Sequence, residues 1–322
     1  MLIPLLAMVV GFIALVWGAD RFVSGAASTA LHFGVSKAVI GLTVVSLGTS
    51  MPEVLVSVAA ALDGNPLLAV GNAIGSNIVN IGLVLGLTAM VVPLPFSRGV
   101  LRTELPWLLI ATGGTMVLFF DLELSRIDGL IFLAGLGYVM YRLARSQTRP
   151  DGQVTGDLAE ELEELPDLGR GQALFWLAVG LAVLLVSARV LVWGAVEMAL
   201  RLGVSELVIG LTVVAAGTSL PELAATFGAA VKGHTEIAIG NVVGSNLFNL
   251  LGVLAIPSLL SAPGIGPDVL WRDCGMMLAI TVALALFAYA IGSRPVITRF
   301  EGAVLLLGWV GYTLLLLEQV PS

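Results

Sequence analysis

Hydrophobic residues run through this chain in long stretches that short polar segments interrupt. A helix needs about 20 mainly apolar residues to cross the hydrocarbon core of a bilayer. Ten stretches approach that length, and the first, MLIPLLAMVV, has no positively charged start, so it is interpreted as a span and not as a signal peptide. The pattern predicts an all-α integral membrane protein with ten transmembrane helices. Their approximate limits are 3–31, 37–62, 67–92, 103–120, 127–144, 173–200, 206–231, 236–260, 274–292 and 302–317.

Composition supports a membrane protein and excludes two other classes. Only 11% of the 322 residues are charged, against about 25% in ordinary soluble domains. The net charge of −7 equals the seven acidic residues in 151–167, and the remaining 15 acidic and 15 basic residues balance. A nucleic-acid binder is excluded for want of a basic surface, and a disulfide framework because Cys274 is the sole cysteine.

Basic residues predict the orientation of the chain. Ten of them fall in one set of alternate loops, whereas the other set holds only Arg126, Arg201 and Arg272. Because cytoplasmic loops carry the excess of Lys and Arg, both termini are expected outside the plasma (inner) membrane of a prokaryote. The acidic linker 146–171 is then cytoplasmic. It is interpreted as a solvated connector, with a Ca²⁺ sensor as the alternative, although no spaced calcium-loop motif is present.

The chain contains a long internal repeat. Residues 41–80 recur, without a gap, as residues 210–249, an offset of 169. Each half holds five predicted spans, and five is odd, so the second copy must enter the bilayer from the opposite side. The expected units are 1–145 and 172–322, an inverted pair of five-helix repeats joined by the linker. Such pairs are typical of secondary transporters, whose sites lie at mid-membrane, although a duplication kept only for packing is the alternative.

Two polar turns interrupt the most similar spans, GTSMPE in the first half and GTSLPE in the second. Proline lacks an N–H and clashes with the carbonyl four residues before it, so these turns free two backbone carbonyls that need a partner in the membrane. Hydroxyl and carboxylate oxygens lie on the same turns. The candidate cation ligands here are Gly48, Thr49, Ser50 and Glu53, with Gly217, Thr218, Ser219 and Glu222.

The two glutamates carry the strongest functional signal. A carboxylate at mid-bilayer costs about 2.5–3.5 kcal/mol on the mildest insertion scale. Apart from Lys37, the first residue of its span, neither span that holds Glu53 or Glu222 contains a Lys or Arg to compensate. A bound cation or protons are therefore expected. The alternative is a pair of protonated glutamates that only form hydrogen bonds between helices.

The third and eighth spans supply further oxygen atoms. GNAIGSN and GNVVGSN contain small-xxx-small spacing, which lets helices approach closely. Residues four apart share a helical face, so Ser76 lies with Asn80, and Ser245 with Asn249. The asparagines at 72, 77, 241 and 246 are interpreted mainly as hydrogen-bond partners between helices. A ligand set of oxygens alone suits Ca²⁺, Na⁺ or Mg²⁺ and argues against Zn²⁺ or copper.

These paired motifs resemble the alpha repeats of the cation/calcium exchanger superfamily, and in particular its prokaryotic sodium/calcium exchanger-like members. The resemblance implies an antiporter, not an enzyme, that works by alternating access without a prosthetic group. Glu53 and Glu222 would be the principal Ca²⁺ ligands, and the hydroxyl residues of the motifs would complete the Ca²⁺ and Na⁺ sites. Well-studied sodium/calcium exchangers have Asp at the position of Asn249, which puts the Na⁺ stoichiometry in question. The alternative function is a Ca²⁺/H⁺ exchanger, and a cation channel ranks below it. K⁺ is a further candidate for a transported ion.

Overall fold

The computed structural model describes residues 2–33, 50–96, 99–147, 168–233, 235–289 and 295–318, which are almost entirely helical. The first half holds α1 (Leu2–His32), α4 (Met51–Leu62), α5 (Pro66–Val79), η2 (Asn80–Leu85), α6 (Gly86–Val91), η3 (Val100–Glu104), α7 (Leu105–Leu118), η4 (Phe119–Asp121) and α8 (Arg126–Gln147). The second half holds α10 (Arg170–Leu202), α11 (Glu206–Ile209), η5 (Gly210–Val214), α12 (Ala215–Thr218), α13 (Leu220–Lys232), α14 (Thr235–Phe248), η6 (Asn249–Val253), α15 (Ala255–Leu260), η7 (Val269–Cys274), α16 (Gly275–Tyr289) and α17 (Arg299–Leu317). Two short antiparallel strands, β1 (Leu94–Pro95) and β2 (Val296–Ile297), pair between the halves.

The described residues contain seven helical segments that are long and apolar enough to cross a membrane. An eighth is added if 206–218 and 220–232, which meet at a bend of 41°, form one span. The predicted span 37–62 is described only from residue 50, and the predicted span 127–144 corresponds to α8. The all-α membrane architecture is confirmed, whereas the count of ten helices stays a prediction.

Matching π-helical turns mark both halves. η2 begins at Asn80 and η6 at Asn249, while η3 begins at Val100 and η7 at Val269. Both pairs are 169 residues apart, which is the offset of the sequence repeat. A π-turn is a rare backbone feature that often occurs at functional sites. The two halves therefore share not only their sequence but also the positions of these irregular turns in the backbone.

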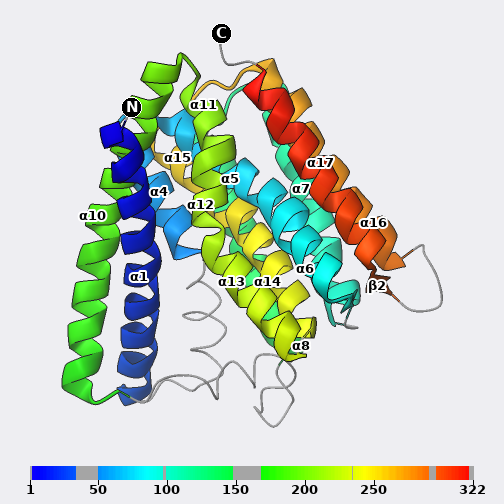
Figure 1. Ribbon diagram of the computed structural model, residues 1–322, viewed down its shortest axis with the longest axis horizontal. Coiled ribbons are helices and arrows are strands. Elements are labelled where there is room, and N and C mark those ends of the chain that lie inside the picture. The colour runs from blue at the N-terminus through cyan, green and yellow to red at the C-terminus, as the bar shows by residue number, and fades with distance from the viewer. Residues whose placement is uncertain are drawn as a thin grey trace.

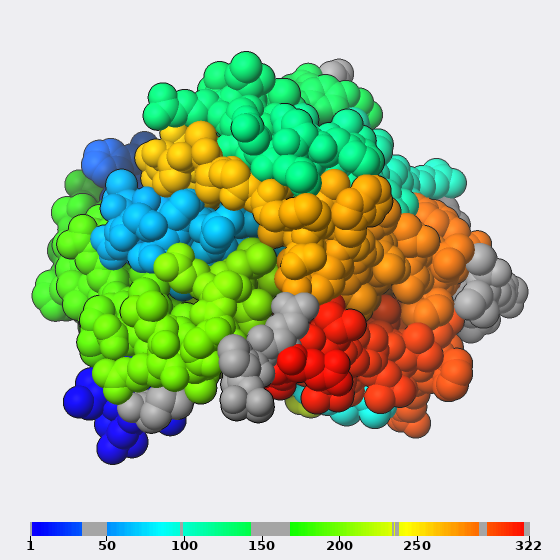
Figure 2. All heavy atoms as spheres, turned by 90° about the horizontal axis from the view of Figure 1, so that it is seen from above, coloured from blue at the N-terminus to red at the C-terminus, as the bar shows by residue number. Residues whose placement is uncertain are grey.

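The two longest helices form a separate pair at one side of the bundle. α1 and α10 lie side by side, away from α16 and α17 (Figure 1), and the view from above shows the same separation (Figure 2). Glycines line their contact: a Cβ on Gly11 or Gly18 would meet α10 at 3.1–3.2 Å, and Gly25 and Gly180 lie still closer to the facing backbone. Small residues let two membrane helices approach in this way.

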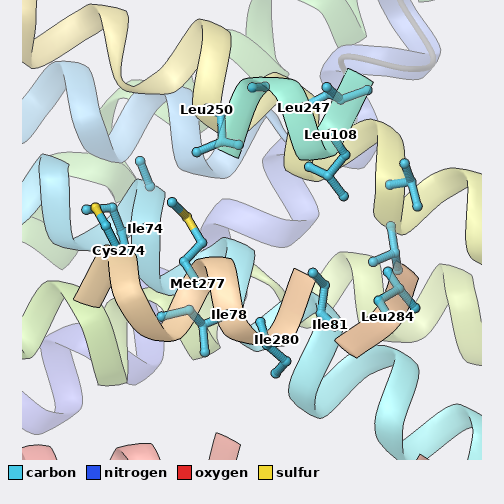
Figure 3. Close-up of a cluster of buried hydrophobic side chains, with 14 of the residues drawn as sticks. Ile74, Ile78, Ile81, Leu108, Leu247, Leu250, Cys274, Met277, Ile280 and Leu284 are labelled. Atoms are coloured by element: carbon cyan, nitrogen blue, oxygen red, sulfur yellow. The ribbon is translucent and has the colours of Figure 1, made fainter. Parts of the chain in front are cut away.

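The third and eighth predicted spans form the centre of the molecule. Residues 66–91 and 238–260 each have a most apolar window that is 78% buried, against 33% for α1 and α10. Ile74, Ile78 and Ile81 pack beside α16 at Met277 and Ile280 (Figure 3). The polar residues of the repeat motifs are thus held in the interior by apolar packing on either side.

Candidate cation site

The two proline turns have the same backbone conformation. Ser50 precedes α4 with φ −86° and ψ 4°, and Ser219 precedes α13 with φ −83° and ψ 4°. Each helix then begins with proline in its first turn, where the missing N–H costs nothing. A new helix therefore starts directly before each glutamate. In the second half, where both sides are described, α12 ends at Thr218 and α13 begins at Leu220, so the predicted interruption is present there.

Both glutamates are buried within these first turns. The exposed fraction is 0% for Glu53 and 1% for Glu222, and the two are close enough for their charges to repel. Neither carboxylate oxygen of Glu53 reaches hydrogen-bonding geometry with a residue that the structure describes, although the Thr218 hydroxyl is nearby. The N-terminus of a helix favours negative charge by up to about 2 kcal/mol in favourable partly buried geometries. That is small against the several kcal/mol needed to bury an uncompensated charge, so a cation or protons must compensate.

Other predicted ligands are also buried. Ser50, Ser76, Asn80, Thr218 and Asn249 are 0% exposed, Ser219 is 1% and Ser245 is 3% exposed. Several of their polar atoms have no hydrogen-bond partner among the described residues, namely Ser50 Oγ, Ser219 Oγ, Asn80 Oδ1, and both Asn249 amide atoms. Buried polar atoms are nearly always paired, so these atoms can accept a partner from outside the described residues. Gly48 and Thr49 lie outside the described residues.

Thr218 and Ser76 join the two halves directly. The Thr218 hydroxyl lies 3.4 Å from Ser76 Oγ and donates to Asn72 Oδ1 at 3.1 Å. The halves also approach closely where α5 meets α11. This contact requires glycine at position 71, because a Cβ there would lie 2.5 Å from Leu207 O. The prediction of tight helix contact is correct for the first motif. Gly244 of the second motif meets nothing within 4 Å among the described residues.

Asn72 and Asn241 form equivalent hydrogen bonds between neighbouring helices. Asn72 donates to Ser57 Oγ at 3.3 Å, and Asn241 donates to Thr226 Oγ1 at 3.2 Å. Their partners are 169 residues apart and four residues after each glutamate, so the repeat itself contained this signal. The interpretation as interhelical partners is confirmed for both asparagines.

Phe12 is a neighbour of the site that the sequence did not indicate. Its ring on α1 lies directly against Gly217, at the place where a Cβ would stand. The repeat places Leu181 at the equivalent position of α10, so no aromatic signal recurs. Glycine at 217 is thus required by the approach of the long helix to the proline turn.

Comparison with known proteins assigns the family. A family model described as sodium/calcium exchanger protein matches residues 3–144 and 172–318. The chain belongs to the sodium/calcium exchanger family. The match covers both halves and leaves out the acidic linker. The resemblance inferred from the motifs is confirmed.

Relatives and solved structures agree with this membership. The chain is 41% identical to the putative antiporter CaxA of Alkalimonas amylolytica, over 99% of this chain and 100% of that protein. It is also 41% identical to the inner membrane protein YrbG of Escherichia coli (strain K12), over 100% and 99%. A structure of the sodium-calcium exchanger NCX_Mj, soaked with Na⁺ and Sr²⁺, aligns at 32% identity over 100% and 99%, with a TM-score of 0.65. The chain is a multi-pass membrane protein and a cation/calcium antiporter.

Proposed function

We propose that this antiporter exchanges Ca²⁺ for Na⁺ by alternating access. The observation that carries the proposal is the pair of buried carboxylates, Glu53 and Glu222, on equivalent proline-started turns beside unpartnered oxygens. Two carboxylates neutralise one Ca²⁺ or two Na⁺. Because leaving both charged and empty is costly, the return step requires another cation, which favours exchange over uniport.

The full ligand set comprises the glutamates, hydroxyls and carbonyls of both turns together with the side chains of the two central spans. Oxygen ligands of this kind suit hard cations. Residues of the first proline turn belong to the proposal on sequence grounds, since Gly48 and Thr49 lie outside the described residues. The complete set is Glu53, Glu222, Thr49, Ser50, Thr218, Ser219, Ser76, Asn80, Ser245, Asn249, Gly48 and Gly217.

We further propose ten helices in two inverted repeats, with both termini outside a prokaryotic inner membrane. The helix ends support an even number of crossings in all and an odd number in the first half: the start of α1 and the end of α17 lie at one end of the bundle, and the start of α10 lies at the other (Figure 1). An even number of membrane crossings places both termini on the same side of the membrane. The linker would then face the cytoplasm as a connector between the units 1–145 and 172–322.

A Ca²⁺/H⁺ exchanger is the second candidate. It is favoured by Asn249, which removes an ionisable group that well-studied sodium/calcium exchangers have. Two neighbouring carboxylates can also be neutralised by two protons, with no further ligand.

Uptake of radiolabelled Ca²⁺ into proteoliposomes distinguishes these functions. Na⁺-loaded vesicles should take up Ca²⁺ when external Na⁺ is removed, and an imposed pH gradient alone should not drive uptake. The reverse dependence would favour the proton exchanger. Uptake that responds to neither gradient would refute both.

A further inference from the structure

Asn77, Asn80 and Asn246 are joined by hydrogen bonds where α5 and η2 lie against α14. Asn80 donates its Nδ2 to Oδ1 of Asn246 at 3.0 Å. Asn246 donates its own Nδ2 to the backbone carbonyl of Asn77 at 3.3 Å. Since Asn246 uses its amide nitrogen on that carbonyl, its oxygen is the atom left to accept from Asn80. One second-half side chain thus holds two residues of the first half.

The repeat pairs Asn77 with Asn246 and Asn80 with Asn249, but the two pairs are not bonded alike. Asn77 donates its Nδ2 to Ala73 O, on its own helix, at 2.8 Å. Asn77 Oδ1 and both amide atoms of Asn249 are buried with no hydrogen-bond partner among the described residues. The bond between Asn80 and Asn246 is therefore made, and its symmetry mate between Asn249 and Asn77 is not.

This asymmetry changes what each half offers a cation. With its nitrogen held by Asn246, Asn80 has a fixed amide plane, and its buried Oδ1 has a fixed direction. Asn249 has no such restraint from the described residues. A ligand oriented before binding contributes more affinity than one that must be ordered, so in this conformation Asn80 is the prepared ligand.

The inverted repeat predicts how this asymmetry changes during transport. When access alternates, each half adopts the conformation that the other half has just left. We propose that Asn77 and Asn246 are positioning residues that exchange roles between the two states. Asn246 orients Asn80 in the conformation described here; Asn77 orients Asn249 in the opposite one, while Asn246 turns back to the carbonyl of Val242. The inference rests on the proposed alternating-access function.

The exchange also explains an amide at 249. In the opposite state Asn249 must donate to Asn77 Oδ1, as Asn80 now donates to Asn246 Oδ1. An ionised aspartate at this position would have no donor and could not form that bond. Asn249 is thus suited to a partner that this chain supplies at position 77.

The test is the KM for Ca²⁺ measured separately on the two membrane faces, using right-side-out and inverted vesicles that contain the full chain. Asn246→Ala should raise the KM on one face by about three- to tenfold, as expected for one lost hydrogen bond to a ligand. Asn77→Ala should raise it by a similar factor on the other face. Asn241→Ala is the matched control, because its bond to Thr226 lies outside this contact, and both faces should change alike.

The ratio of the two KM values decides the matter. Opposite shifts of this ratio in the two variants support the exchange, and equal ratios or shifts in the same direction overturn it. Asn246→Ser and Asn77→Ser give the same comparison should an alanine variant fail to fold. Absent exchange by the unmodified chain would overturn the proposed function and this inference together, whereas normal exchange with unshifted ratios would overturn this inference alone.

Discussion

The hydroxyl of Thr218 donates a hydrogen bond to the amide oxygen of Asn72 at 3.1 Å and so links the two halves of the chain. Asn72 then donates to Ser57 Oγ and to the carbonyl of Glu53, both at 3.3 Å. One hydroxyl therefore connects the second proline turn to the helix that carries the first glutamate. Neutral hydrogen-bonding groups therefore connect the two turns.

Thr218→Val should loosen this coupling. It removes the hydroxyl and leaves the buried Asn72 oxygen unpaired, so the free energy of unfolding should fall by about 1–3 kcal/mol. The KM for Ca²⁺ should rise as well, because Thr218 also lies beside Ser76 and Glu53. Thermal unfolding in detergent and Ca²⁺ uptake measure the two effects. Thr226→Val, which removes only the partner of Asn241, should lower stability without raising the KM for Ca²⁺. An equal rise of the KM in both variants would contradict the placement of Thr218 in the cation site.

Gly217→Ala should reduce exchange strongly, because the added methyl group would occupy the position of the Phe12 ring. Overpacking of this kind costs about 1–3 kcal/mol. The double variant Phe12→Ala/Gly217→Ala should recover much of the initial uptake rate. Gly228→Ala is the control, since its Cβ meets nothing within 4 Å among the described residues. Failure of Phe12→Ala to rescue any activity would show that the glycine is needed for another reason.

Asn249→Asp should change the cation dependence of exchange. The substitution adds an ionisable oxygen at a buried position whose amide is unpartnered among the described residues. We expect steeper dependence on Na⁺ and greater sensitivity to pH, measured as Ca²⁺ uptake over a series of Na⁺ concentrations and pH values. Asn241→Asp alters a neighbouring interhelical bond and should not reproduce the change. Unaltered Na⁺ and pH profiles would remove Asn249 from the proposed site.

Acidification should weaken Ca²⁺ binding. If Glu53 and Glu222 are the proposed Ca²⁺ ligands, protons and Ca²⁺ compete for the same two carboxylates, and a protonated carboxyl no longer offers a negative charge. The KM for Ca²⁺ should therefore rise as the pH falls, with a smaller change in the maximal rate. Uptake at fixed Na⁺ gradient over a pH series tests this. A KM independent of pH would argue against buried glutamates as ligands.

Much of this arrangement was predictable because the membrane makes polar atoms conspicuous. The helical fold follows from apolar stretches, and the helix starts before Glu53 and Glu222 follow from proline chemistry. The close contact at Gly71 follows from small-residue spacing. In each case a single local property, readable from a few neighbouring residues, fixes the outcome.

Other features could not be predicted, since they depend on the state of the whole molecule. Asn77 and Asn246 stand at equivalent positions, so the repeat gives no reason for one to bond within its helix and the other across the halves. The contact of Phe12 with Gly217 depends on how α1 lies against the core.

Ca²⁺ uptake by Glu53→Gln and Glu222→Gln tests most directly whether the two buried carboxylates bind the transported cation. Glutamine keeps the size of each side chain and removes its charge, while Glu123→Gln, an exposed position, serves as the control. We expect each site variant to insert and purify normally and to lose Na⁺-driven uptake to the level of empty vesicles, with the control unchanged. Retained Ca²⁺ exchange in both site variants would contradict the account.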